Sequence, residues 1–161
     1  MIKTNAKQSS YLEDGVAEMH DSKFMSAREK ERVVKQWEAF LKNECARARF
    51  TKTLYTHLIM HCSFIAHYDI NGFYDTYFTE GEDTARFLSQ FDRSKGCRSV
   101  ELGMTYWLTG EDYGDINSVM VNIAARYIPA LTHAAQIQQR ETDVKRAKAL
   151  LAKHGIAIKE G

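Results

Sequence analysis

Two histidines, His57 and His61, are the residues in this sequence whose type and spacing come nearest to a known chemistry. On an α-helix, three intervening residues place both imidazoles on one face, one turn apart, where they can chelate a single metal ion. The pair differs from a metalloprotease motif, because Leu58 stands where that motif has its glutamate. One hypothesis is therefore a divalent metal at His57 and His61, and a narrower variant is an axial haem ligand.

Such a site needs a third ligand from elsewhere in the chain. On a continuous helix His67 points about 120° away from His61, so it cannot complete the site. The sequence does not choose among the remaining candidates. These are Glu44, Asp69, Glu80, Asp83, Cys97, Glu101 and His133. The alternative is that both histidines are core residues whose ring N–H groups bind carbonyl or hydroxyl oxygens, and on this interpretation we expect no cofactor.

Other catalytic patterns are missing from the sequence. Cys62 follows His61 directly, and adjacent helical positions do not face each other, so a thiol–imidazole pair is not expected there. Three scattered cysteines without a Cys-x-x-Cys pair indicate reduced thiols. No glycine-rich phosphate loop occurs, and the acidic clusters at 80–83 and 111–115 do not match a calcium loop. The sequence therefore favours a protein that is not an enzyme.

A basic segment, Arg47, Arg49 and Lys52 around Phe50, is the candidate contact for an anionic partner. Alternating cations beside an aromatic ring can grip a phosphate backbone, so nucleic acid is one partner to consider. The net charge is only +1, however, whereas dedicated duplex-binding proteins are more basic. Basic ends flank an acidic middle. This pattern fits solvated helix faces, basic ends that meet an anionic partner, or ends and middle that meet each other, and a protein partner is one further candidate.

Hydrophobic periodicity predicts the helices that would position these residues. Ser26 and Glu29 have the spacing of a capping box, and the apolar residues that follow them recur every three or four positions. The charged residues of this helix, including Lys30, are assigned to its solvent faces. Residues 50–68 are apolar nearly all round the helix, which predicts a buried central helix carrying both histidines.

The C-terminal third of the chain predicts one long helix. Asp115 is its expected N-cap, and an apolar stripe continues from there past Pro129, where the missing N–H should kink the helix. Residues 134–154 keep only a thin apolar stripe. Thin stripes on long helices often pair with a second chain, so we expect a homodimer with Val144 and Leu151 in the seam. Ala147 and Ala149 would allow close approach.

The sequence as a whole predicts an all-α fold: a compact helical bundle of five to seven helices, with a buried central helix at about 50–68 and a long, Pro-kinked C-terminal helix. Residues 1–22 are expected to form a polar arm or short helix, and residues 23–161 a single helical domain. No apolar stretch is long enough to span a bilayer and no signal core is seen, so we expect a cytoplasmic protein without membrane contact.

The favoured function is a non-enzymatic helical interaction or regulatory module that acts as a homodimer through charged faces. The alternative is a metal- or haem-binding protein that uses His57 and His61.

Overall fold

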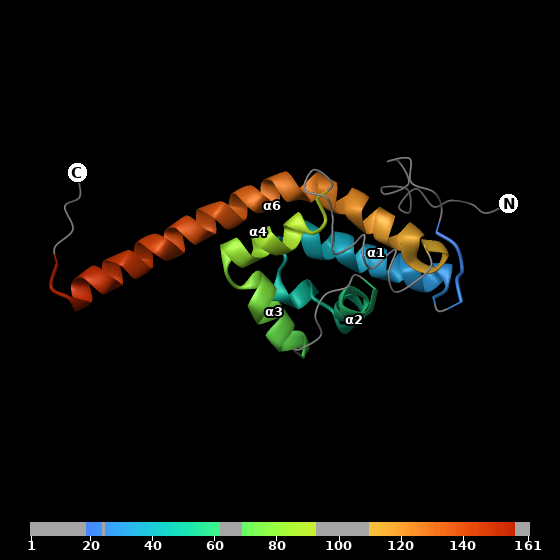
Figure 1. The fold of residues 1–161 in the computed structure, drawn as a ribbon, viewed down its shortest axis with the longest axis horizontal. Helices are drawn as coiled ribbons and strands as arrows, with labels where there is room; N and C mark the ends of the chain where they lie inside the picture. The colour runs from blue at the N-terminus through green and yellow to red at the C-terminus, as the bar shows by residue number, and fades with distance from the viewer. Residues whose placement is uncertain (1–18, 24, 62–68, 93–109, 157–161) are drawn as a thin grey trace.

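A computed structural model describes residues 19–23, 25–61, 69–92 and 110–156 of the chain (Figure 1). The described residues form helices and contain no strand, which confirms the predicted all-α class. The elements in chain order are α1 (Ala27–Lys42), the 3₁₀ helix η1 (Arg47–Arg49), α2 (Lys52–His61), α3 (Ile70–Phe78), α4 (Gly81–Ser89) and α6 (Gly110–Lys153). The long helix α6 runs along the whole molecule, with α1 and α4 packed against it and with α2 and α3 lying on the far side of those two helices.

Helix α1 forms as its sequence predicts. The Ser26 hydroxyl accepts a hydrogen bond from the Glu29 amide at 3.2 Å, and the Glu29 carboxylate accepts one from the Ser26 amide at 3.1 Å. This reciprocal pair satisfies two amides that would otherwise lack a partner at the helix start. The predicted apolar stripe is fully buried along one face of the helix. Its members are Val33, Val34, Trp37, Phe40 and Leu41.

Aromatic rings fill the core between the helices. The Trp37 ring lies 4.7 Å from Phe91, and the Phe50 ring stacks on Phe73 at 5.8 Å with an angle of 10° between their planes. Such ring contacts stabilise the fold beyond the effect of the apolar area that they bury, because ring edges and ring faces carry opposite partial charges. The indole nitrogen of Trp37 also donates to the backbone carbonyl of Met120 at 2.9 Å, which fastens α1 to α6.

The region predicted as the central helix corresponds to α2. Its described part begins at Lys52 and ends at His61, and residues 62–68 lie outside the described part of the chain. Within α2 the side chains of Leu54, His57 and Leu58 are buried, whereas Lys52 is exposed. The N-terminal arm predicted for residues 1–22 likewise lies mostly outside the described residues.

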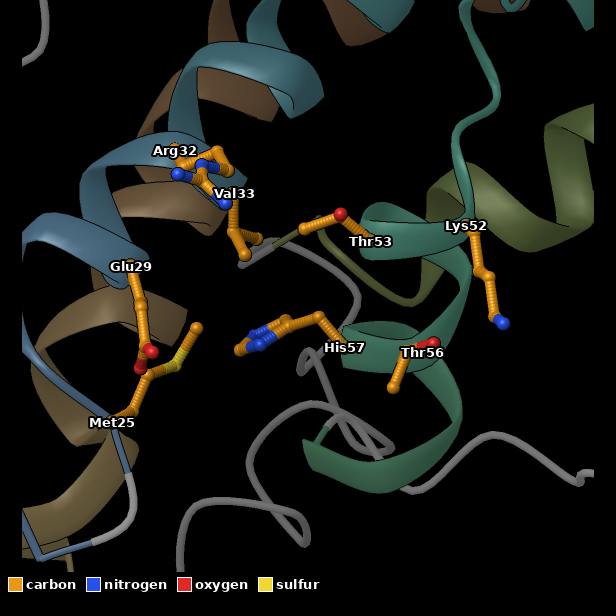
Figure 2. A pocket seen from close by; sticks show the side chains of 8 residues that line it. All are labelled: Met25, Glu29, Arg32, Val33, Lys52, Thr53, Thr56 and His57. Carbon is orange, nitrogen blue, oxygen red and sulfur yellow. The ribbon is translucent and has the colours of Figure 1, made fainter.

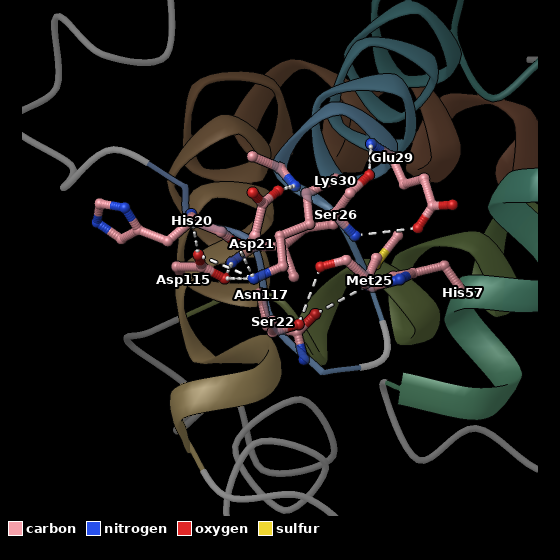
Figure 3. A network of polar contacts seen from close by, with 12 residues as sticks. His20, Asp21, Ser22, Met25, Ser26, Glu29, Lys30, His57, Asp115 and Asn117 are labelled. Atoms are coloured by element: carbon pink, nitrogen blue, oxygen red, sulfur yellow. Dashed lines mark hydrogen bonds and ion pairs between the residues drawn. The ribbon is translucent and has the colours of Figure 1, made fainter.

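Two assignments for charged residues were wrong. Helix α6 begins at Gly110, so Asp115 lies inside the helix rather than at its N-cap. Lys30 was expected to be exposed to solvent, but it is 0% exposed. Its ammonium group donates to both carboxylate oxygens of Asp115, at 2.9 and 3.0 Å. The His20 carbonyl accepts a third hydrogen bond from Lys30 at 2.7 Å (Figure 3). The cap pattern predicted the wrong role for Asp115, because burying the Lys30 ammonium without a carboxylate partner would cost more free energy than leaving α6 without a cap at this position.

Helix α6 contains Pro129, as predicted, and Figure 1 shows that the helix changes direction near its middle. Beyond the proline, α4 begins very close to α6: a Cβ atom added to Gly81 would stand 2.1 Å from the carbonyl oxygen of Ala135. Only glycine allows this approach. The last part of the helix, beyond the Arg146–Glu80 ion pair, extends away from the other helices (Figure 1). Among the described helices, none combines the length and the apolar composition that a bilayer-spanning segment requires.

Replacing Lys30 with alanine tests the buried ion pair. The substitution leaves the Asp115 carboxylate, 16% exposed, without its cation, and we expect the free energy of unfolding to fall by about 3 kcal/mol. Lys35→Ala is the matched control, because that exposed lysine pairs with Glu31 only along the helix surface. This substitution should lower the free energy of unfolding by about 0.5 kcal/mol or less. Urea denaturation measures both values, and equal costs would contradict this assignment.

The end of α1 offers a second test. Glu44 has φ 56° at the position after the C-cap, where its amide and that of Cys45 donate back to Leu41 and Phe40. A side chain is strained in this left-handed conformation, and glycine is not. Glu44→Gly should therefore raise the free energy of unfolding by about 0.5–1 kcal/mol. Lys42→Gly, at the last residue of α1, where the conformation is helical, should instead lower it, by up to about 1 kcal/mol. A destabilised Glu44→Gly variant would refute the strain argument.

Candidate functional site

An open groove of about 420 Å³ lies between α1 and α2 (Figure 2). Its size is within the range of small-molecule sites. Apolar and polar side chains both contribute to its walls. The lining residues are Met25, Glu29, Arg32, Val33, Lys52, Thr53, Thr56 and His57. Figure 2 shows the His57 ring entering the space between the two helices, towards Met25 and Val33.

The charged groups of the groove stand at its rim. Arg32 on α1 and Lys52 on α2 are exposed, and no hydrogen bond or ion pair joins their side chains to the rest of the described chain. Glu29, the acid on the rim, already accepts the Ser26 amide. The groove therefore presents an excess of positive charge. Its groups could neutralise an anionic ligand, but the described lining residues do not pair a nucleophile with a base.

His57 is the most buried polar residue of the groove, at 2% exposure. Its Nε2 atom lies 3.0 Å from Oδ1 of Asn117, which is itself fully buried on α6 (Figure 3). An amide oxygen accepts hydrogen bonds only, so with this orientation Nε2 carries the hydrogen and presents no lone pair to a metal. The contact connects α2 to α6 across the core.

The described residues do not assemble the ligands of a metal site. Within them, no group of three or more His, Cys, Asp or Glu side chains is placed to hold an ion. Two of the third-ligand candidates have other roles: Asp69 caps α3 through the Gly72 amide, and Glu80 pairs with Arg146 at 2.8 Å. The side chain of His61 lies outside the described part, as do Cys97 and Glu101. The metal hypothesis at His57 and His61 stays a prediction.

The three cations of the basic segment have different surroundings. Arg47 donates to the carbonyl of Phe50 at 3.1 Å and to the side chain of Asn71 at 2.6 Å, and its guanidinium lies 5.6 Å from the Tyr74 ring. It therefore ties η1 to α3. Arg49 is exposed, and of the three only Lys52 lines the groove. All three residues are exposed, and their contact with an anionic partner stays a prediction.

The thiol of Cys45 is unsuited to nucleophilic chemistry. Burial, with a smaller contribution from the neighbouring Glu44 charge, raises its pKa to about 12. Almost no thiolate exists at neutral pH with such a pKa, and the thiolate is the reactive form. Cys45 is a free, buried thiol that packs in the core, as the sequence suggested for its cysteines.

Sequence reasoning missed Asn117 and the Lys30–Asp115 pair. A signal for each was present, because both Lys30 and Asn117 fall on the apolar stripe of their helix, at positions where a hydrophobic residue is expected. A polar residue on a buried stripe indicates a buried partner, but identifying that partner requires the tertiary structure.

Comparison with protein-family models, with curated proteins and with solved structures found no match for this chain.

A His57→Ala substitution tests the structural role of this histidine. It removes the hydrogen-bond partner of Asn117 Oδ1 and leaves a cavity, so we expect the free energy of unfolding to fall by about 2–4 kcal/mol. Thr53→Ala, exposed on the same helix, is the control and should change stability by about 0.5 kcal/mol or less. Elemental analysis of both proteins adds a second reading: a metal that the parent protein holds and His57→Ala loses would favour the metal hypothesis instead.

Proposed function

We propose that this chain is a helical interaction module whose distal α6 segment, residues 137–153, binds a second copy of the chain. Helix α6 has 44 residues and spans about 66 Å, whereas the 16 residues of α1 span about 24 Å. The bundle therefore cannot cover all of α6. The described side chains from 140 onward are exposed, apart from partial cover at Thr142 and Leu151.

The single observation that carries the proposal is an apolar stripe on this exposed segment. Ile137 and Val144 are 48% and 45% exposed although both are large and apolar, and Leu151 continues the same series. The three residues are spaced by seven, which places them on one line along the helix. Ala147 lies beside that line and is small enough to let another helix approach closely.

The stripe faces away from the bundle. Helix α4 and the residue before it contact α6 at Ala135, at Gln139 through the Glu82 amide, and at Arg146 through Glu80. At about 100° per residue, Ile137, Val144 and Leu151 lie about 160–200° round the helix from Ala135. The stripe is therefore on the side opposite α4, where a second helix could pack without displacing any described contact.

Energetics favour a partner for this segment. Isolated helices are marginal in water, and most helical stability in proteins comes from packing an apolar face. The heptad spacing of the stripe is the pattern through which two helices pack side by side. A second copy of the chain presents the matching stripe, as symmetric oligomers require. The charged residues on either side of the stripe would then border the interface, in keeping with a dimer that also uses charged faces.

Substitution at the centre of the stripe tests the proposal. Val144→Asp places a charge where two apolar surfaces would meet, in both copies, so the dimer dissociation constant should rise by at least about tenfold. Ala149→Asp is the matched control: it adds the same charge five residues along, on a face away from the stripe, and should leave association nearly unchanged.

Sedimentation equilibrium over a wide concentration range measures both constants. Circular dichroism of each variant confirms that the bundle remains folded. A parent chain that stays monomeric at every concentration would contradict the proposed function.

A further inference from the structure

We infer that the two copies of the distal α6 segment pair antiparallel, with residue 144 of one copy beside residue 147 of the other. This inference rests on the proposed function and adds to it the orientation and register of the partner. The charge pattern of the segment, the identity of its interface residues and the exposed face described above carry the argument.

The two halves of the distal segment have opposite charge. Residues 137–143 contain Glu141 and Asp143 against Arg140, whereas residues 144–153 contain four cations and no acid. The cations are Lys145, Arg146, Lys148 and Lys153. A parallel pair would place the cationic half of one copy beside the cationic half of the other. In the antiparallel register, residues 148–153 of one copy lie beside residues 138–143 of the other, so that Lys148 comes near the acidic residues Glu141 and Asp143, which is favourable.

The residues of the stripe favour the same orientation. If Ile137, Val144 and Leu151 occupy the first position of each heptad, Arg140 and Ala147 occupy the fourth. Parallel helices place each position opposite itself, so the two Arg140 side chains would meet inside the interface. In the antiparallel register, Arg140 lies beside Leu151 of the second copy. There its methylene stem can cover the leucine while the guanidinium remains in water.

The same register forms a specific pair of ion contacts. Glu141 and Lys148 are one heptad apart and lie on the same flank of the stripe, about 60° and 40° round the helix from Val144. In the antiparallel pair, Glu141 of each copy lies near Lys148 of the other, so the contact occurs twice. In a parallel pair, Lys148 would instead lie near Asp143 of the second copy. The partner of Lys148 therefore distinguishes the two orientations.

Charge reversal tests this pairing. In low salt, Glu141→Lys and Lys148→Glu should each weaken the dimer about threefold to tenfold, because each creates two repulsive contacts. The double variant Glu141→Lys/Lys148→Glu should return to within about twofold of the parent, because both contacts are restored with reversed sign. A parallel dimer predicts rescue by Asp143→Lys/Lys148→Glu instead. A double variant as weak as the single ones, or rescue through Asp143, would overturn the antiparallel assignment.

A distance measurement provides an independent reading that does not depend on electrostatics. A spin label at Lys153→Cys, in a chain whose native cysteines are replaced by alanine, reports the separation of the two segment ends. In the antiparallel register residue 153 lies beside residue 138 of the second copy, so the labels are about 22 Å apart along the axis. Parallel pairing would bring them to about 10 Å, the spacing of two helix axes.

The two experiments separate the failure of this inference from failure of the proposed function. A chain that never dimerises contradicts the function itself. A dimer that Val144→Asp disrupts, but whose labels lie about 10 Å apart, retains the function and overturns only the orientation. A dimer that Val144→Asp leaves intact would place the interface elsewhere and overturn both.

Discussion

The arrangement of the helices depends on one buried contact, the ion pair between Lys30 of α1 and Asp115 of α6. Burying an ammonium group without a partner is very costly, so a folded state that encloses Lys30 must bring a carboxylate to it. The Asp115 carboxylate does so with both oxygens, and the His20 amide donates to the same group at 2.9 Å. Lys30 and Asp115 are 85 positions apart in the sequence, so their contact determines which part of α1 lies beside the first turns of α6.

A second polar contact then sets the direction of α6. Trp37 lies two turns beyond Lys30 on α1, and its indole binds the carbonyl of Met120, five residues beyond Asp115. Two contacts in the same order along both helices make α1 and α6 run in the same direction. The aromatic core packs beneath them, and α4 meets α6 at Gly81. Since α6 is far longer than α1, a helix held in this way must leave the bundle, with its apolar stripe turned away from α4. The proposed interface is thus a consequence of how the start of α6 is anchored.

Much of the fold was predictable because it follows from local pattern. The Ser26–Glu29 capping box and the α1 stripe depend on residues a few positions apart, and the length of α6 follows from its periodicity. The partners of Lys30 and His57 were not predictable, because Asp115 and Asn117 are distant in sequence and only folding brings them close. Local cap chemistry even suggested the wrong role for Asp115. For the interface, the sequence indicated the apolar residues Val144 and Leu151, but only the structure shows which side of α6 is already occupied.

Amide hydrogen exchange can check the proposal that the distal α6 segment packs against a second copy of the chain. Exchange is measured over residues 137–153 at increasing protein concentration, with α1 as the internal reference. Amides of the distal segment should become more protected as concentration rises, while those of α1 keep the same protection throughout. Rapid exchange in residues 137–153 at every concentration, beside a stable α1, would contradict the proposal.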